Sequence, residues 1–249
     1  MAAAAPARLL PDLVQEAPSG LVVRESPDGP LLGFASAVTN LGDGPLIVDA
    51  SRPTLDRPTM LAEQVVPRPG RAPLRHAGAG ELRYVESPDH SHRHLSPFER
   101  YELRRVGGRR AVRSGKQGFC LGDRYPSPLA PRHAPLRPSF VTNCGRSSPA
   151  KLRLREGISV GYGDDYAAIL EGQSVPLAGL PPGRYVLVHW VNGDRRLLET
   201  DYSNNAASVL VRLAWRGGRP RVTKLKVCVG SAVCPLPGRS RVAAGGPPG

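Results

Sequence analysis

The sequence predicts an all-β fold, an antiparallel β-sandwich with long loops and little helix. Short apolar runs alternate with turn residues along most of the chain, as in sandwich proteins. The 249 residues include 28 glycines and 27 prolines, more than helical proteins usually carry. No sustained 3.6-residue periodicity is present, and the one helix candidate is a short segment around 164–171. No apolar run approaches the roughly 20 residues of a spanning helix, which excludes a transmembrane role.

Eight segments are predicted to form strands. They are 21–23, 31–38, 45–48, 81–86, 98–106, 151–155, 185–191 and 207–213. The turn-forming sequence NLGDG at 40–44 predicts a hairpin between the second and third of them. The stretches 67–75 and 124–138 are rich in Pro and Arg, and we expect them to be long surface loops.

The chain divides by composition into three parts. Residues 1–18 are rich in Ala and Pro and are expected to be flexible, and 19–215 form the predicted sandwich domain. Residues 216–249 form a basic tail rich in Gly, Pro and Arg, expected to be disordered from about residue 235. The tail has seven Arg or Lys residues and no acidic residue, so it accounts for much of the net charge of +13. It is either a solubilising end or a nonspecific, salt-sensitive contact for polyanions.

Four cysteines form two local pairs, Cys120 with Cys144 and Cys228 with Cys234. Each pair is either a disulfide or two free thiols, and neither spacing matches a paired zinc-binding motif. Disulfides would indicate an oxidising compartment, so we expect an extracellular or secreted protein. The first residues lack the basic and apolar regions of a signal peptide, which leaves the cytoplasm as the alternative.

Three of the six histidines lie within five residues, at His90, His92 and His94. In an extended strand such positions share one face and lie about 7 Å apart, while Ser91 and Arg93 face the other way. Three imidazoles suit Cu(II), Zn(II) or Ni(II), and the lack of a nearby carboxylate or thiolate favours copper. The alternative is a His-rich polar loop that binds metal only adventitiously.

The order of further motifs carries a family resemblance. After HSHRH come FERYEL at 98–103, KQGFCLGD at 116–123, GYGDDY at 161–166 and DYSNN at 201–205. Together they resemble the catalytic domain of the lysyl oxidase family, in a bacterial-like form, over roughly 31–213. The histidine motif followed by KQGFCL is distinctive. The DYSNN turn is also similar to the hairpin ends of noncatalytic β-sandwiches.

This resemblance implies that copper(II) is held by the three histidines and that Lys116 and Tyr166 form lysine tyrosylquinone. Only an unprotonated lysine amine is nucleophilic enough for such a cross-link. Without the other motifs, Lys116 would be interpreted as an exposed lysine in a loop and Tyr166 as an ordinary tyrosine of the core. Asp164 matches a family Asp and is a candidate general base, with an ion pair to an Arg or a turn cap as the alternatives.

The implied enzyme is a protein-lysine 6-oxidase-like copper amine oxidase. It would convert primary amines, either peptidyl lysine or small amines, to aldehydes with oxygen as acceptor, releasing hydrogen peroxide and ammonia. The net charge of +13 would repel cationic substrates, which predicts either a small-amine substrate or a local acidic patch. The candidate patch residues are Asp164, Asp165, Asp194, Glu199 and Asp201. The alternative function is a noncatalytic, secreted β-sandwich module that binds metal or partners.

Overall fold

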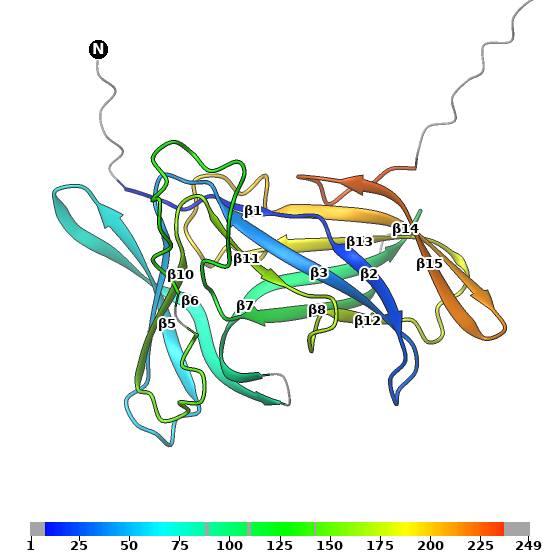
Figure 1. The fold of residues 1–249 in the computed structure, drawn as a ribbon, viewed down its shortest axis with the longest axis horizontal. Helices are drawn as coiled ribbons and strands as arrows, with labels where there is room; N and C mark the ends of the chain where they lie inside the picture. Colours follow the sequence, from blue (N-terminus) through cyan, green and yellow to red (C-terminus); the bar gives the residue numbers. More distant parts are fainter. Residues whose placement is uncertain (1–7, 88–89, 109–110, 142, 237–249) are drawn as a thin grey trace, which may run out of the picture.

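The computed structural model describes residues 8–87, 90–108, 111–141 and 143–236, without the side chains of Ser87, His90, Ser114, Lys116 and Gln117. These residues form two antiparallel β-sheets, and none of them is helical (Figure 1). The all-β prediction is confirmed. The predictions for the first seven residues and for 237–249 lie outside the described residues. Within the described part, no helix is long and apolar enough to cross a membrane.

The smaller sheet is built around β3 (Leu31–Asn40). Its other strands are β1 (Leu13–Gln15), β2 (Ser19–Arg24), β9 (Tyr125–Pro126), β11 (Tyr162–Tyr166) and β12 (Ser174–Pro176). The larger sheet runs in the order β10 (Arg153–Ile158), β4 (Leu46–Ser51), β5 (Thr59–Arg68), β6 (Arg71–Ser87), β7 (His90–Arg105), β13 (Gly183–Val191), β14 (Ala206–Arg216) and β15 (Arg219–Cys228). Strand β8 (Ala111–Phe119) also pairs with β7.

The two sheets pack face to face around a shared core. One apolar cluster joins Val38 of β3 to Met60 and Leu95 of the larger sheet. A second joins Phe34 of β3 to Leu187 of β13 in the same way. Burying apolar side chains from both sheets between them is what makes a sandwich stable. The site described below lies where β7, β8 and β11 meet.

The expected hairpin at 40–44 is wrong, because β3 and β4 belong to different sheets. The chain crosses between the layers here, and the Asn40 side chain holds the crossing. Its Nδ2 donates to the carbonyl oxygens of Gly44 and Ile158, and its Oδ1 accepts from the backbone N–H of Asp12. A turn-forming sequence therefore connects two layers instead of two paired strands.

The stretch 67–75 is also not a loop. Strands β5 and β6 pair as far as Arg68 and Arg71, and Gly70 has the positive φ of +66° that the tight turn requires. The loop expected at 124–138 is present, apart from the two residues of β9.

The helix expected at 164–171 is wrong as well. Its first residues belong to β11, which pairs with β3 from Gly163 to Tyr166. The ring of Tyr125 occupies the space that a side chain at Gly163 would need, so this short strand is fixed by packing against β9.

Strand β15 was not identified from the sequence. It forms a hairpin with β14 through Gly217 and Gly218, both at positive φ. Its Lys and Arg residues are typical of an edge strand and obscure the alternation of apolar residues.

Candidate active site

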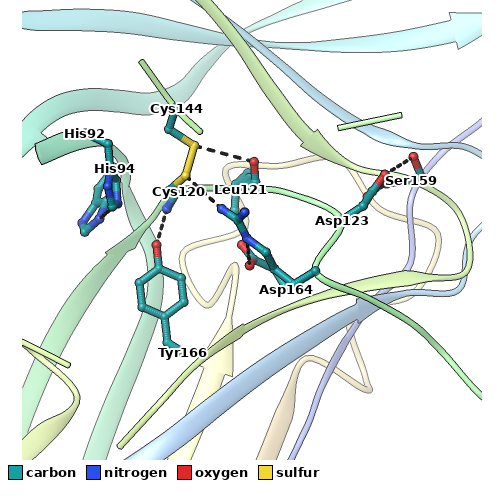
Figure 2. Close-up of polar contacts among 10 residues, drawn as sticks. His92, His94, Cys120, Leu121, Asp123, Cys144, Ser159, Asp164 and Tyr166 are labelled. Carbon is teal, nitrogen blue, oxygen red and sulfur yellow. Dashed lines mark hydrogen bonds and ion pairs between the residues drawn. A yellow bond between two sulfur atoms is a disulfide. The ribbon is translucent and has the colours of Figure 1, made fainter. Parts of the chain in front are cut away.

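His92 and His94 extend from the same face of β7, and their imidazoles meet (Figure 2). Their Nε2 atoms are 2.9 Å apart and their ring centroids are 4.8 Å apart. Arg93, between them, is buried on the other face and donates from Nη2 to the carbonyl oxygen of Pro149 at 2.9 Å. The alternation predicted for this motif is therefore present for two of the three histidines. The side chain of His90 lies outside the described residues.

The chemistry of this pair fits a copper ion. Neutral imidazole nitrogens are preferred donors for Cu(II) and Zn(II), and two of them converge here. Among the described residues, no group of three or more His, Cys, Asp or Glu side chains is arranged to hold a metal. His92 and His94 thus bring two imidazole nitrogens together, and a metal site formed by the three histidines remains a prediction.

Tyr166 lies beside the histidines at the end of β11. Its ring centroid is 4.0 Å from that of Phe119 and 6.0 Å from that of His94. Its hydroxyl accepts a hydrogen bond of 2.6 Å from the backbone N–H of Cys120 (Figure 2). Burial, together with the nearby Asp164, raises the pKa of the Tyr166 phenol above its ordinary value, so the hydroxyl is neutral at physiological pH.

A pocket of about 170 Å³ opens beside Tyr166 and His94. Its lining residues are Val85, His94, Gly118, Tyr166, Glu171, Gly172 and Gln173. A Cβ atom on Gly118 would lie 2.9 Å from the Cβ of His94, so the glycine allows β8 to approach the histidine strand. Lys116 lies in β8 two residues before Gly118, and its backbone pairs with that of Arg100. Its side chain lies outside the described residues.

The disulfide between Cys120 and Cys144 ties the end of β8 to the loop between β9 and β10. The two Cα atoms are 5.6 Å apart, and the carbonyl oxygen of Cys144 accepts a hydrogen bond from the Arg93 backbone at 2.9 Å. Cys120 thus connects to Tyr166 through its N–H and to the histidine strand through its partner. Cys228 and Cys234 form the second disulfide, so both sequence pairs are bonded.

Comparison with known proteins agrees with this geometry. Residues 63–224 match the sequence profile described as lysyl oxidase, which is more than half of the chain. The chain belongs to the lysyl oxidase family. Mouse lysyl oxidase homolog 4 is 30% identical over 138 residues, which cover 55% of this chain and 16% of the mouse protein. Rat protein-lysine 6-oxidase is 29% identical over 128 residues, which cover 49% of this chain and 27% of the rat protein.

The chain thus spans about a quarter or less of the length of these two relatives. Membership in the lysyl oxidase family supports an amine oxidase-like function at the level of the family. The two relatives are animal proteins, so the bacterial-like form expected from the sequence remains a prediction.

Asp164, the predicted base of this lysyl oxidase family member, is fully buried two residues before Tyr166. Its Oδ1 lies 3.3 Å from Nε of Arg124, and Nη2 of Arg124 lies 3.3 Å from Sγ of Cys120. Burial raises the pKa of Asp164 to about 8, although Arg124 opposes the rise. The Asp164 side chain does not line the pocket. Its pairing with an Arg is the alternative that the sequence left open.

A second buried carboxyl group, Glu156 of β10, was missed by sequence analysis. Its side chain has no exposed surface. Neither oxygen accepts a hydrogen bond of normal geometry from a described residue, although the Leu121 backbone lies close. Burial, followed by the negative charge of Asp164, raises the pKa of Glu156 well above its ordinary value. The two carboxyl groups therefore favour their protonated forms.

A polar network also lies between the sheets behind Tyr166. Ser36 pairs with Tyr166 in the β3–β11 register, and its hydroxyl donates to Oε2 of Glu99 at 2.6 Å. The same hydroxyl lies 2.9 Å from Nδ1 of His189. Burial raises the pKa of Glu99 to about 8 and lowers that of His189 to about 3. Because all three side chains are buried, the network supports the site and offers no surface to a substrate.

The DYSNN segment forms a turn held by its own side chains. Asp201 accepts a hydrogen bond of 2.7 Å from the Ser203 backbone, and Asn205 donates to Glu199 at 2.7 Å. Glu199 is 5% exposed and Asp164 is 0% exposed. These two residues therefore cannot contribute to the acidic surface patch that was expected.

Proposed function

We propose that this protein is a copper-dependent amine oxidase of the protein-lysine 6-oxidase type. It converts primary amines, either peptidyl lysine or small amines, to aldehydes with oxygen as acceptor, releasing hydrogen peroxide and ammonia. The observation that carries the proposal is that His94, whose imidazole meets that of His92, lines one pocket together with Tyr166 in a lysyl oxidase family member.

In this proposal His90, His92 and His94 hold copper(II), and Lys116 and Tyr166 supply lysine tyrosylquinone. When bound, the copper and the quinone provide the oxidising chemistry that a protein side chain lacks. The donor chemistry of the two described imidazoles and the position of Tyr166 beside them support this assignment.

The surrounding residues have positioning and proton-handling roles. Phe119 and the backbone N–H of Cys120 fix the ring and hydroxyl of Tyr166, and their burial limits access of water. Asp164 is the proposed proton acceptor, because its Oδ2 accepts no hydrogen bond of normal geometry from a described residue while Arg124 anchors its Oδ1. With a pKa of about 8 this carboxyl is mostly protonated at neutral pH, so only its ionised fraction would accept a proton, and that fraction grows as the pH approaches 8.

We place the protein in an extracellular or secreted setting, with the cytoplasm as the alternative. The two disulfides support this placement because such bonds persist in oxidising compartments. Contact of the basic segment 216–249 with polyanions would be an additional, nonspecific property.

Peroxide release tests the function directly. Copper-loaded, aerated protein is mixed with a panel of primary amines and compared with Lys116→Ala and with the control Lys151→Ala, an exposed lysine. The wild type and the control should release peroxide, and Lys116→Ala should not. Equal peroxide from all three would refute the cofactor assignment. No peroxide from the wild type would favour the noncatalytic module that binds metal or partners.

A further inference from the structure

Strands β13, β14 and β15 form one end of the larger sheet (Figure 1). One side of these strands faces the core, because Tyr185, Val211 and Leu213 belong to the second apolar cluster and Val222 packs against it. Successive side chains of a strand point to opposite sides, so the alternate residues face solvent. Five exposed arginines lie at such positions, and we call them the arginine face: Arg184, Arg212, Arg216, Arg219 and Arg221.

Two pairs of like charges stand opposite each other on the arginine face. Arg184 of β13 is paired in register with Arg212 of β14, and Arg216 is paired with Arg219 of β15. Like charges directly opposite each other in an antiparallel pair are destabilising. Strands β13, β14 and β15 contain no Asp or Glu, and none of the five arginines forms an ion pair with a described residue. An anionic partner would relieve this repulsion.

The arginines are spread along a strip and do not converge on one point. Arg212 and Arg216 are four residues apart on β14, which is about 13 Å in a strand, and neighbouring strands lie about 5 Å apart. A guanidinium group presents paired N–H donors to an oxyanion. The spacing therefore suits an extended partner that carries many anionic groups better than a single small ion.

A groove continues the positive surface toward β7. Its volume is about 250 Å³, and its lining includes Val186, which lies on the same side of β13 as Arg184. Arg104 and Arg105 of β7 also line it. Arg104 is paired with Glu102, whereas Arg105 forms no ion pair with a described residue. A bound chain can therefore extend from the β14–β15 hairpin across β13 to the end of β7.

The tryptophans of these strands are not free to stack on nucleic-acid bases. The ring of Trp190 is covered by Arg100, whose guanidinium carbon lies 4.5 Å from the ring centroid. Trp215 packs against the second apolar cluster, and its Nε1 donates to the carbonyl oxygen of Leu180 at 2.9 Å. Proteins that bind single-stranded nucleic acids stack the bases on aromatic side chains. In the proposed extracellular setting, the sulfate groups of a polysaccharide are therefore the better match.

We propose that the arginine face binds a linear sulfated polysaccharide, whose sulfate oxygens accept hydrogen bonds from the guanidinium groups. This binding neutralises both pairs of opposed charges. It gives the expected polyanion contact of segment 216–249 a folded location, which includes β13 and β14, and a chemical class of partner. It rests on the proposed extracellular setting for the choice of polymer and is independent of the amine oxidation.

Calorimetry with a heparin octasaccharide and the full chain tests this assignment. The wild type should bind saturably, and Kd should rise steeply with salt concentration. Arg184→Gln/Arg212→Gln should raise Kd about tenfold at about 0.1 M salt, because two exposed charge contacts are lost. The second variant, Arg216→Gln/Arg219→Gln, should have an effect of the same size.

A charge-matched control and two further measurements keep the test decisive. The control Arg132→Gln/Arg137→Gln removes two exposed arginines from the loop between β9 and β10 and should leave Kd nearly unchanged. Without heparin, Arg184→Gln/Arg212→Gln should have a Tm at least as high as that of the wild type, because the opposed arginines repel each other. Duplex DNA of the same total charge should bind more weakly than the octasaccharide.

Three results would overturn the assignment. The first is no binding of heparin to the wild type, or an equal change of Kd in the control and in the variants of the arginine face. The second is DNA bound as tightly as heparin, which would contradict a polysaccharide partner. The third is a lower Tm of Arg184→Gln/Arg212→Gln, which would contradict the repulsion between the opposed arginines.

Discussion

The hydroxyl of Tyr166 accepts a hydrogen bond from the backbone N–H of Cys120, and the same cysteine is bonded to Cys144. Cys120 therefore links the disulfide to Tyr166, the proposed cofactor residue. Because the Phe119 ring packs on Tyr166 from the preceding position of the chain, the end of β8 fixes both the ring and its oxygen. The position of the phenol therefore depends on the disulfide as well as on β11.

Removing the Cys120–Cys144 disulfide should lower the free energy of unfolding by about 3 kcal/mol, because the bond closes a 24-residue separation. The double variant Cys120→Ser/Cys144→Ser tests this by urea denaturation. The control Cys228→Ser/Cys234→Ser opens a separation of only 6 residues and should cost about 2 kcal/mol. A larger loss in the control than in the site variant would contradict the tethering role.

Stability of the metal-free protein should fall as pH rises from about 6.5 to 8. Burial raises the pKa of Glu99 to about 8, so the folded state keeps a proton that the unfolded state has already lost. Asp164 acts in the same direction. His189 has a pKa of about 3 in the folded state and near 6.5 in the unfolded state, so it is neutral in both states above pH 6.5 and adds little to the pH dependence of stability there.

Chemical denaturation across this pH range measures the effect. Glu99→Gln keeps the shape of the side chain without the ionisable proton, so it should reduce the slope by up to about 1.4 kcal/mol per pH unit. A wild-type stability that stays constant or increases over the same range would contradict the expectation that these carboxyl groups are protonated in the folded state.

Copper binding should depend on the histidine strand. His92→Ala removes one of the two imidazoles that meet at 2.9 Å, so most of the bound copper should be lost. Metal content by mass spectrometry, compared with His133→Ala in an exposed loop, checks this. Copper retained in full by His92→Ala would argue for a site elsewhere.

Sequence patterns were sufficient for features that depend on neighbouring residues. The spacing of His92 and His94 predicted that they share a face, and apolar runs located strands such as β13 and β14. Turn residues were less informative, because Asn40 bonds to partners far along the chain and directs it into the other sheet. Strand β15 was not recognised in the sequence, because water can solvate charged residues at most positions of an edge strand and they interrupt the alternation of apolar and polar residues.

The buried polar groups required the structure. Ser36, Glu99 and His189 come from three strands, and their contacts depend on the registers of β3, β7 and β13. Glu156 likewise becomes informative only when its burial is known. No local pattern distinguishes such a residue from an ordinary polar residue at the end of a strand.

The most direct measurement is peptide mapping of copper-loaded, aerated protein by mass spectrometry. The account predicts that the tryptic peptides containing Lys116 and Tyr166 are recovered as one covalently joined species, which is absent when copper is withheld. Recovery of the two peptides separate and unmodified after copper loading would contradict the quinone and, with it, the oxidase function.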